Sequence, residues 1–242
     1  MERDFKTLAI AIKREKVREK DMLLTLLTPD NGIIYALSYG SLKSNKAIKV
    51  PLYSEGSFSL FKKNASSFHI KDAEIISEHE ESKNSIAKIG WTSLFSELII
   101  KGRASDSLIY RLFTSVLDRI NDENIDNCAI YFIIHYLSWM GLVGDWENCP
   151  ECGKRFEDEE VLGYSALVNA PCCSSCDTLS SSLILPPNAR RYLKRISEVD
   201  IDEALSFTIS SLQSHRITKY LTRLLQFSFP LQLKTIESGL IV

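Results

Sequence analysis

The sequence lacks a hydrophobic segment that would export the chain or anchor it in a membrane. Its first 21 residues contain 12 charged side chains, which leaves no apolar core for a signal peptide. The longest apolar stretch, Ala129–Val143, is shorter than the roughly 20 residues that a membrane-spanning helix requires, and His135 and Gly141 interrupt it. We therefore expect a cytoplasmic protein in which this stretch forms a buried helix.

Motifs typical of enzyme active sites are also missing. The sequence contains neither G-x-x-x-x-G-K-[ST] nor G-x-G-x-x-G, the usual phosphate-binding patterns, and neither G-x-S-x-G nor H-E-x-x-H. The four histidines are scattered, and no general acid is paired with a general base. His135 falls on an apolar helix face, where a hydrogen-bonded core histidine is the commoner role. We therefore predict that the chain is not an enzyme.

The charge of the chain is small and unevenly distributed. The net charge is -2, which argues against a simple nucleic-acid binder. Residues 1–76 hold 13 basic and 9 acidic side chains, whereas residues 118–160 hold 3 basic and 11 acidic ones. The basic first third can meet phosphate groups, and the acidic segment can meet a basic protein or simply be solvated.

The first third of the sequence has the pattern of β structure. Five apolar or alternating runs follow one another, and Asn31-Gly32 is typical of a tight hairpin turn between the second run and the third. A polar loop with three lysines covers residues 40–49. Short strands in such close succession predict a small barrel. The five runs are Phe5–Lys13, Met22–Thr28, Ile33–Tyr39, Leu52–Lys62 and Ser67–Ile76.

From Ser82 onward the apolar residues recur at helical spacing. One helix is predicted up to Gly102, and a second reaches Ile120, with Ser105 or Asp106 as its cap. The next helix, Asp126–Leu142, is apolar on almost all sides, which predicts a place at the centre of a helix bundle. The expected fold class is α+β: a five-stranded N-terminal barrel, then an α-helical part with a cysteine-rich insert. The later helical patterns are Asp126–Leu142, a short helix from Pro186-Pro187-Asn188 to Ile196, Asp202–Leu212 and Ser214–Phe227.

Four of the six cysteines occur as two Cys-x2-Cys hooks. Cys149 and Cys152 form the first hook, and Cys173 and Cys176 form the second after 20 intervening residues. Each hook places two thiolates on a tight turn, and two hooks together surround a zinc ion tetrahedrally. Four thiolates leave no coordination position for water, so we predict one structural zinc ion. The small hairpin that carries such hooks is expected within Val161–Val168.

Other roles for the cysteines fit the pattern less well. A disulfide framework is unexpected in a chain without an export signal, and a redox Cys-x-x-Cys belongs at a strand-to-helix junction. Retained cysteines that no longer bind metal stay an alternative. Cys172 is the spare residue, because a Cys-x3-Cys hook from Cys172 matches the first hook less well than one from Cys173. Cys128 lies on the apolar helix and is predicted to be a core residue.

Basic side chains gather in two loops of the predicted barrel, after the first strand and after the third. Loops at one end of a barrel can converge into a groove that follows a phosphate backbone. The interleaved Glu15, Glu19 and Asp21 weaken the positive field, and a solvated turn is the ordinary alternative. The basic residues proposed to contact DNA are Lys13, Arg14, Lys16, Arg18, Lys43, Lys46 and Lys49.

A second basic surface is predicted on the last long helix. Arg216, Lys219 and Arg223 recur on one side of it, away from the apolar residues that pack. This side can meet an acidic peptide or DNA, and solvation is the simpler reading.

These features follow one another in a particular order along the chain. Leu27-Thr28-Pro29-Asp30-Asn31-Gly32-Ile33 stands at the hairpin, a basic loop begins at Gly40, and helices, both cysteine hooks and a terminal helix pair follow. The order and spacing resemble the RecO family of bacterial recombination mediators over nearly the whole chain. The best local matches are Glu19–Gly40, Leu142–Gly153 and the second hook.

The resemblance implies a domain organisation and a non-catalytic role. A RecO-family protein is expected to bind single- and double-stranded DNA, to anneal complementary strands and, with RecR, to help load RecA onto DNA coated with single-stranded-DNA-binding protein (SSB). The loop cations given above would contact DNA, and Arg216, Lys219 and Arg223 would receive the acidic tail of SSB. Such a protein works in the cytoplasm, at the nucleoid. The implied domains are an OB-fold at 1–79, a helical domain at 80–148 and 178–242, and a zinc module at 149–177.

Two segments depart from the family pattern. The basic loop begins Tyr39-Gly40-Ser41-Leu42 where the family has a Lys-Gly-Ala-Arg-like run, and Asn169-Ala170 replaces Gly-Gly before the second hook. We therefore expect modest, salt-sensitive DNA affinity. The alternative function is a zinc-stabilised adaptor that binds proteins without touching DNA, and the third is an enzyme whose site has no familiar motif.

Overall fold

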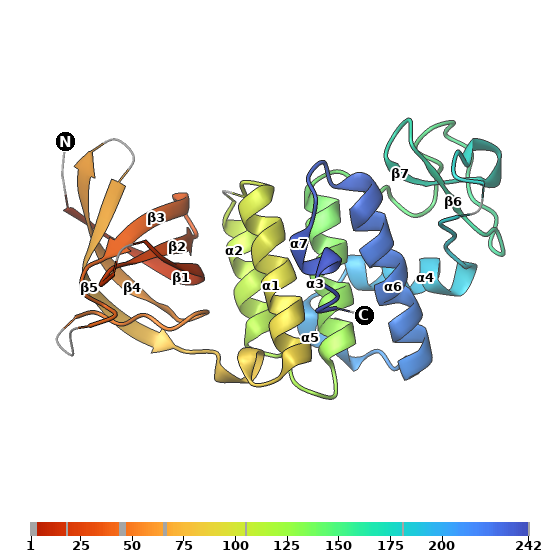
Figure 1. The fold of residues 1–242 in the computed structure, drawn as a ribbon. Helices are drawn as coiled ribbons and strands as arrows, with labels where there is room; N and C mark the ends of the chain where they lie inside the picture. The colour runs from red at the N-terminus through yellow and green to blue at the C-terminus, as the bar shows by residue number, and fades with distance from the viewer. Residues whose placement is uncertain are drawn as a thin grey trace. The chain divides into compact units, whose positions relative to one another are not determined.

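A computed structural model describes residues 4–17, 19–43, 47–64, 67–104, 106–180 and 182–241 of the chain. The chain divides into two compact units: residues 1–85 with 92–118, and residues 86–91 with 119–242. A five-stranded sheet lies in the first unit, and most of the second is helical (Figure 1). The α+β class expected from the sequence is thus confirmed, while the finer division at residues 79, 148 and 177 stays a prediction.

The N-terminal strands close into a barrel in the order β1-β2-β3-β5-β4. Strand β1 pairs antiparallel with both β2 and β4, and β3 runs parallel to β5. This is the order of the OB-fold, and each strand end lies within three residues of its predicted position. The strands are β1 (Asp4–Lys16), β2 (Met22–Thr28), β3 (Gly32–Ser38), β4 (Glu55–Asn64) and β5 (Ser67–Ser77).

The barrel forms because alternate residues of its strands are apolar and point inward. Leu24, Ile34 and Phe58 are buried in one cluster with residues of β1 and β5. The hairpin between β2 and β3 is the predicted one: Gly32 has a φ of 62°, and the Thr28 hydroxyl accepts the Asn31 N–H at 3.0 Å and donates to the Gly32 carbonyl at 2.8 Å.

Helical elements complete the first unit. A short helix, η1 (Glu80–Lys83), precedes α1 (Ile86–Lys101), whose residues from 92 onward belong to this unit, and α2 (Ser107–Leu117) follows. The Asp106 carboxylate caps α2 by accepting the Leu108 N–H at 2.8 Å. Of the two predicted caps, Asp106 is therefore confirmed, and Ser105 lies outside the described residues.

The second unit is built around α3 (Ile125–Trp139), which is buried along most of its length as predicted. It packs against α4 (Pro187–Ser197), α5 (Ile201–Ser206) and α6 (Ser211–Ser228), and α7 (Lys234–Glu237) follows (Figure 1). Cys128 of α3 is fully buried in this core, whereas His135 of α3 is half-buried, with Nε2 3.1 Å from the Ile196 carbonyl oxygen. Burial lowers the pKa of His135, which favours its neutral form.

The prediction of one continuous helix over Asp202–Leu212 is wrong. Helix α5 ends at Ser206, Phe207 is extended, and a new helix begins after Ser210. The reason is a capping box, in which the Ser210 hydroxyl accepts the Gln213 N–H while the Gln213 side chain accepts the Ser210 N–H. Ser210 thus starts α6 inside a stretch whose apolar spacing looks continuous.

Among the described residues, no helix is both long and apolar enough to span a bilayer.

Candidate nucleic-acid interface and metal centre

Two loops of the barrel are hydrogen-bonded to each other. The Gly40 N–H, just after β3, donates to Asp21 Oδ1 at 2.9 Å, and Asp21 ends the turn between β1 and β2. The Leu42 N–H donates to the Lys20 carbonyl oxygen at 3.1 Å. These two contacts hold the two basic loops together at one end of the barrel.

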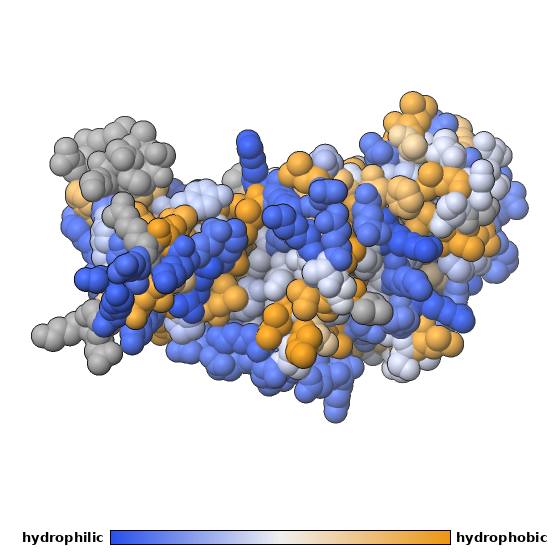
Figure 2. Space-filling view, in the orientation of Figure 1, coloured by the Kyte–Doolittle hydropathy of each residue, from blue (hydrophilic) through white to orange (hydrophobic). Residues whose placement is uncertain are grey.

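The predicted DNA-binding cations occupy these loops and the strand ends beside them. Two of them have acidic neighbours: Lys13 pairs with Glu15 at 2.8 Å, and Lys43 lies 3.4 Å from Glu19. Hydrophilic residues cover much of the visible barrel surface (Figure 2). Arg18 and Lys46 lie outside the described residues. The five predicted DNA-binding cations that the structure describes are all exposed: Lys13, Arg14, Lys16, Lys43 and Lys49.

The cysteine hooks are shaped by local backbone contacts. In the first hook the Gly153 N–H donates to the Cys149 carbonyl at 2.8 Å, and Gly153 has a φ of 74°, which a glycine adopts without strain. In the second, the Cys176 N–H donates to the Cys173 carbonyl at 3.0 Å within η2 (Ser174–Cys176). Each hook is therefore a tight turn that presents two sulfur atoms on one side.

The hairpin between the hooks lies later in the chain than predicted. It consists of β6 (Gly163–Ser165) and β7 (Ala170–Cys172) rather than lying within Val161–Val168. The turn falls at residues 166–169, where Asn169 has a φ of 52°. As a result β7 runs directly into the second hook.

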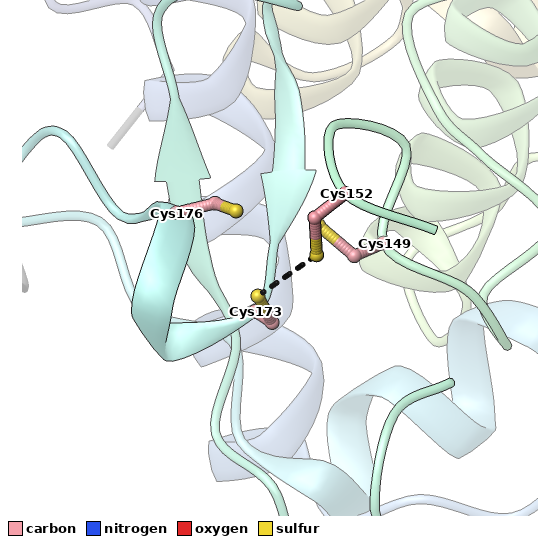
Figure 3. Close-up of side chains that lie close together, drawn as sticks. All are labelled: Cys149, Cys152, Cys173 and Cys176. Carbon is pink, nitrogen blue, oxygen red and sulfur yellow. Dashed lines mark hydrogen bonds between the residues drawn. The ribbon is translucent and has the colours of Figure 1, made fainter. Parts of the chain in front are cut away.

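The four hook sulfurs face a common centre (Figure 3). All four lie within 4.8 Å of one another, and Cys152 Sγ is 3.7 Å from Cys173 Sγ. A tetrahedral zinc ion with Zn–S bonds of about 2.3 Å sets its sulfur atoms about 3.8 Å apart. The donor set and its spacing therefore fit a four-thiolate metal site that leaves no open position.

The thiols differ in how readily they ionise. Burial raises the pKa of Cys149, but the backbone N–H groups of Cys173, Cys152 and Glu151 donate to its sulfur and bring the pKa down to about 7. Burial raises the pKa of Cys172 to about 12, and Cys172 is not among the four clustered sulfurs. Cys172 is thus a buried neutral thiol, in agreement with its prediction as the spare residue.

The cysteine module is joined to two helices of its own unit. The Arg190 guanidinium of α4 donates to the Glu157 carbonyl at 2.7 Å and the Asp158 carbonyl at 3.1 Å. On the other side, the Tyr164 hydroxyl lies 3.0 Å from Ser228 Oγ of α6. The module is therefore an attached part of the helical unit.

The three cations predicted on the last long helix are exposed on α6, beside two hollows of the second unit. Arg216 lines a largely apolar groove of about 350 Å³ together with residues of α4 such as Tyr192. Lys219 and Arg223 line a smaller hollow of about 200 Å³, whose apolar wall includes Trp91. The helix thus presents positive charge next to apolar surface.

Comparison with protein families decides the assignment. Residues 1–79 match the family model described as Recombination protein O N terminal, and residues 83–236 match the model Recombination protein O C terminal. The chain belongs to the RecO family. This membership confirms the resemblance drawn from the order of motifs.

Individual relatives agree with the RecO assignment over most of their length. A protein of Dehalococcoides mccartyi is 26% identical over 204 residues, which cover 82% of this chain and 80% of the relative. One of Clostridium kluyveri is 25% identical over 236 residues, covering 93% and 89%, and one of Clostridium novyi is 24% identical over 240 residues, covering 96% and 92%. Each carries the name DNA repair protein RecO, so the family is one of DNA repair proteins.

This RecO-family barrel also carries a row of rings that the sequence analysis did not single out. The Tyr39 and His69 ring centroids are 4.8 Å apart, and those of Phe61 and His69 are 6.4 Å apart. Tyr39 directly follows β3, His69 lies on β5, and Phe61 lies on β4. Strand alternation could have indicated that they face outward, but sequence alone does not show that β5 lies between β3 and β4.

A second group missed by the sequence analysis joins the RecO-family barrel to α2 within the first unit. His79, whose side chain is 1% exposed, places Nδ1 3.1 Å from Asp118 Oδ1 and Nε2 3.7 Å from Glu55 Oε2. The Tyr110 hydroxyl of α2 donates to Glu55 Oε1. These contacts, above all the one with His79, lower the pKa of Glu55 although burial opposes them.

Replacing Glu55 by glutamine is expected to destabilise the first unit by about 1–2 kcal/mol at neutral pH. Because the pKa of Glu55 is lower in the folded state, its stabilising effect is complete above the unfolded pKa and is lost as pH falls through the folded one. Urea unfolding of both proteins between neutral and strongly acidic pH measures this. The difference in unfolding free energy should shrink on acidification, and a difference independent of pH would contradict the assignment.

Proposed function

We propose that this RecO-family chain is a recombination mediator in DNA repair that binds single- and double-stranded DNA through the basic loops of its barrel. The observation that carries the proposal is the pair of basic loops held together by Gly40–Asp21 and Leu42–Lys20 hydrogen bonds. OB-folds bind nucleic acids through such loops and the neighbouring strands. The glutamates paired with Lys13 and Lys43 reduce the positive field, so binding is modest and salt-sensitive.

In this proposal the chain performs no catalytic step. It anneals complementary strands and, with RecR, helps RecA to load onto DNA coated with SSB. Family membership supports a role in DNA repair, and these partners and steps are the specific form that we propose for it. The protein then works where the DNA is, in the cytoplasm at the nucleoid.

The four hook cysteines hold one structural zinc ion in this proposal. Their thiolates supply the whole tetrahedral donor set, and the ion cross-links the turn before Gly153 to the turn after β7. Because Arg190 and Tyr164 join the same module to α4 and α6, the metal fixes the module on the helical unit. It supplies no chemistry to a substrate.

The basic side of α6 receives the acidic tail of SSB in this proposal. Arg216, Lys219 and Arg223 offer positive charge beside the two hollows, and an acidic peptide with apolar side chains needs both. The support is the chemical match between this surface and such a peptide.

A second function, a protein-binding adaptor without DNA contact, is favoured by one observation. Two of the exposed loop cations, Lys13 and Lys43, already have glutamate partners and are less available to phosphate. The two functions predict opposite results in a test of strand annealing on SSB-coated DNA, because an adaptor that does not touch DNA cannot bring complementary strands together.

A further inference from the structure

The ring row lies on the outer face of the barrel. Leu60 and Ile70 point into the barrel core, so their neighbours Phe61 and His69 point outward by strand alternation. Phe61 and His69 stand directly opposite each other in the β4–β5 ladder, and His69 pairs with Leu37 across the parallel β3–β5 ladder. The rings of Phe61 and His69 are therefore neighbours on two paired strands, and Tyr39 directly follows β3, which pairs with the other side of β5.

The rings of the row are accessible and held in place. Tyr39 is 45% exposed, and Phe61 and His69 are partly exposed. The Tyr39 hydroxyl is hydrogen-bonded to His69 Nε2 at 3.1 Å, and the two rings meet edge to face at 83°. This contact fixes the orientation of the Tyr39 ring, so little side-chain freedom is left to lose when a ligand stacks on it.

The row begins at the basic loops. Tyr39 directly precedes Gly40, whose N–H is bound by Asp21 of the neighbouring loop. At the other end of the row, Lys71 Nζ lies 5.0 Å from the Phe61 ring centroid and 2.7 Å from Asp4 Oδ2. A DNA strand whose phosphates follow the basic loops can thus continue over the rings and pass Lys71, for which the Asp4 carboxylate competes.

We propose that Tyr39, His69 and Phe61 form a stacking platform for unpaired bases, which makes the barrel prefer single-stranded to double-stranded DNA. The inference rests on the proposed DNA-binding function and adds to it a preference for single strands. Aromatic rings stack on any unpaired base, whereas in a duplex the base faces are covered by their neighbours. Phosphate contacts alone give no such preference, because both forms of DNA offer phosphates.

A double variant, Tyr39→Leu with Phe61→Leu, tests the platform. Leucine keeps apolar volume at both positions but removes the rings. Affinity is measured by fluorescence anisotropy at one fixed salt concentration for three labelled ligands of equal length: a single strand, a duplex and an abasic single strand. We expect the variant to lose about tenfold in affinity for the single strand and to keep its affinity for the duplex and the abasic strand.

Matched controls separate stacking from folding and from surface hydrophobicity. Tyr39→Phe loses the hydroxyl but keeps the ring and its edge-to-face contact with His69, and it should keep most of the single-strand affinity. Phe227→Leu removes an exposed ring of α6, 50% exposed, and should change nothing. Equal thermal unfolding midpoints for the double variant and the unmodified chain establish that the barrel is intact, and a variant that fails this comparison is replaced by Phe61→Leu alone.

The outcomes distinguish failure of the stacking platform from failure of the proposed DNA-binding function. Equal affinity of the unmodified chain for normal and abasic strands, or an equal loss on strand and duplex in the double variant, overturns the platform. If the unmodified chain binds duplex and single strand alike and the ring variants have no effect, the platform is wrong and the proposed function stands. An unmodified chain that binds none of the three ligands refutes both.

Discussion

Replacing Cys152 by alanine is expected to abolish metal binding and to unfold the cysteine module. The unmodified chain should be purified with about one zinc ion and the variant with almost none, since three thiolates leave the site open. The segment from Cys149 to Cys176 has only the short β6–β7 hairpin and the three-residue η2 as regular structure, so its order depends on the metal. Metal analysis and amide hydrogen exchange of the module measure the two effects.

Cys172 provides the matched control for this prediction. It is adjacent to the hook residue Cys173 and fully buried, but its sulfur is not in the cluster. Cys172→Ala should keep the zinc and the slow amide exchange, whereas Cys173→Ala should lose both. Equal loss of zinc in the two variants would mean that the hooks have been assigned to the wrong cysteines.

Reversing the charge of three cations on β1 is expected to lower DNA affinity by at least about tenfold. The variant combines Lys13→Glu, Arg14→Glu and Lys16→Glu, which replace three exposed cations at the end of β1, beside the basic loops. Each lost phosphate contact should also reduce the slope of log affinity against log salt by about one. Titration of single-stranded DNA at several salt concentrations gives both quantities.

A triple variant of equal charge change serves as the control. Arg111, Arg155 and Lys234 are exposed and lie outside the barrel, so their replacement by glutamate changes the net charge by the same amount without altering the basic loops. Affinity that falls equally in both triple variants would indicate a general effect of charge. Affinity unchanged by the β1 substitutions would favour the adaptor without DNA contact.

Local features of the structure were the ones that sequence could predict. Strand β2 matches its prediction because polar segments bound it on both sides, Asp30-Asn31-Gly32 after it and the charged residues that precede Met22. The two hooks could be recognised because the ligands of each hook lie three residues apart, so that identifying them requires no knowledge of distant contacts. Helix α2 was similarly delimited by its own capping residue, Asp106.

Features that depend on long-range contacts could not be predicted in the same way. The Phe61–His69 pair requires the β4–β5 register, and Tyr39 joins it only because β3 runs parallel to β5. His79 and Glu55 meet because β4 begins where β5 ends, so no spacing in the sequence marks them. The hydrogen bond from Gly40 to Asp21 is another contact of this kind.

The most direct test of the central claim is the annealing of complementary single strands coated with SSB. The unmodified chain is added alone and then with RecR, and duplex formation is followed over time with labelled strands. We predict that it accelerates annealing and that the Lys13→Glu, Arg14→Glu, Lys16→Glu variant does so much less. No acceleration by the unmodified chain, even with RecR present, would contradict its assignment as a recombination mediator.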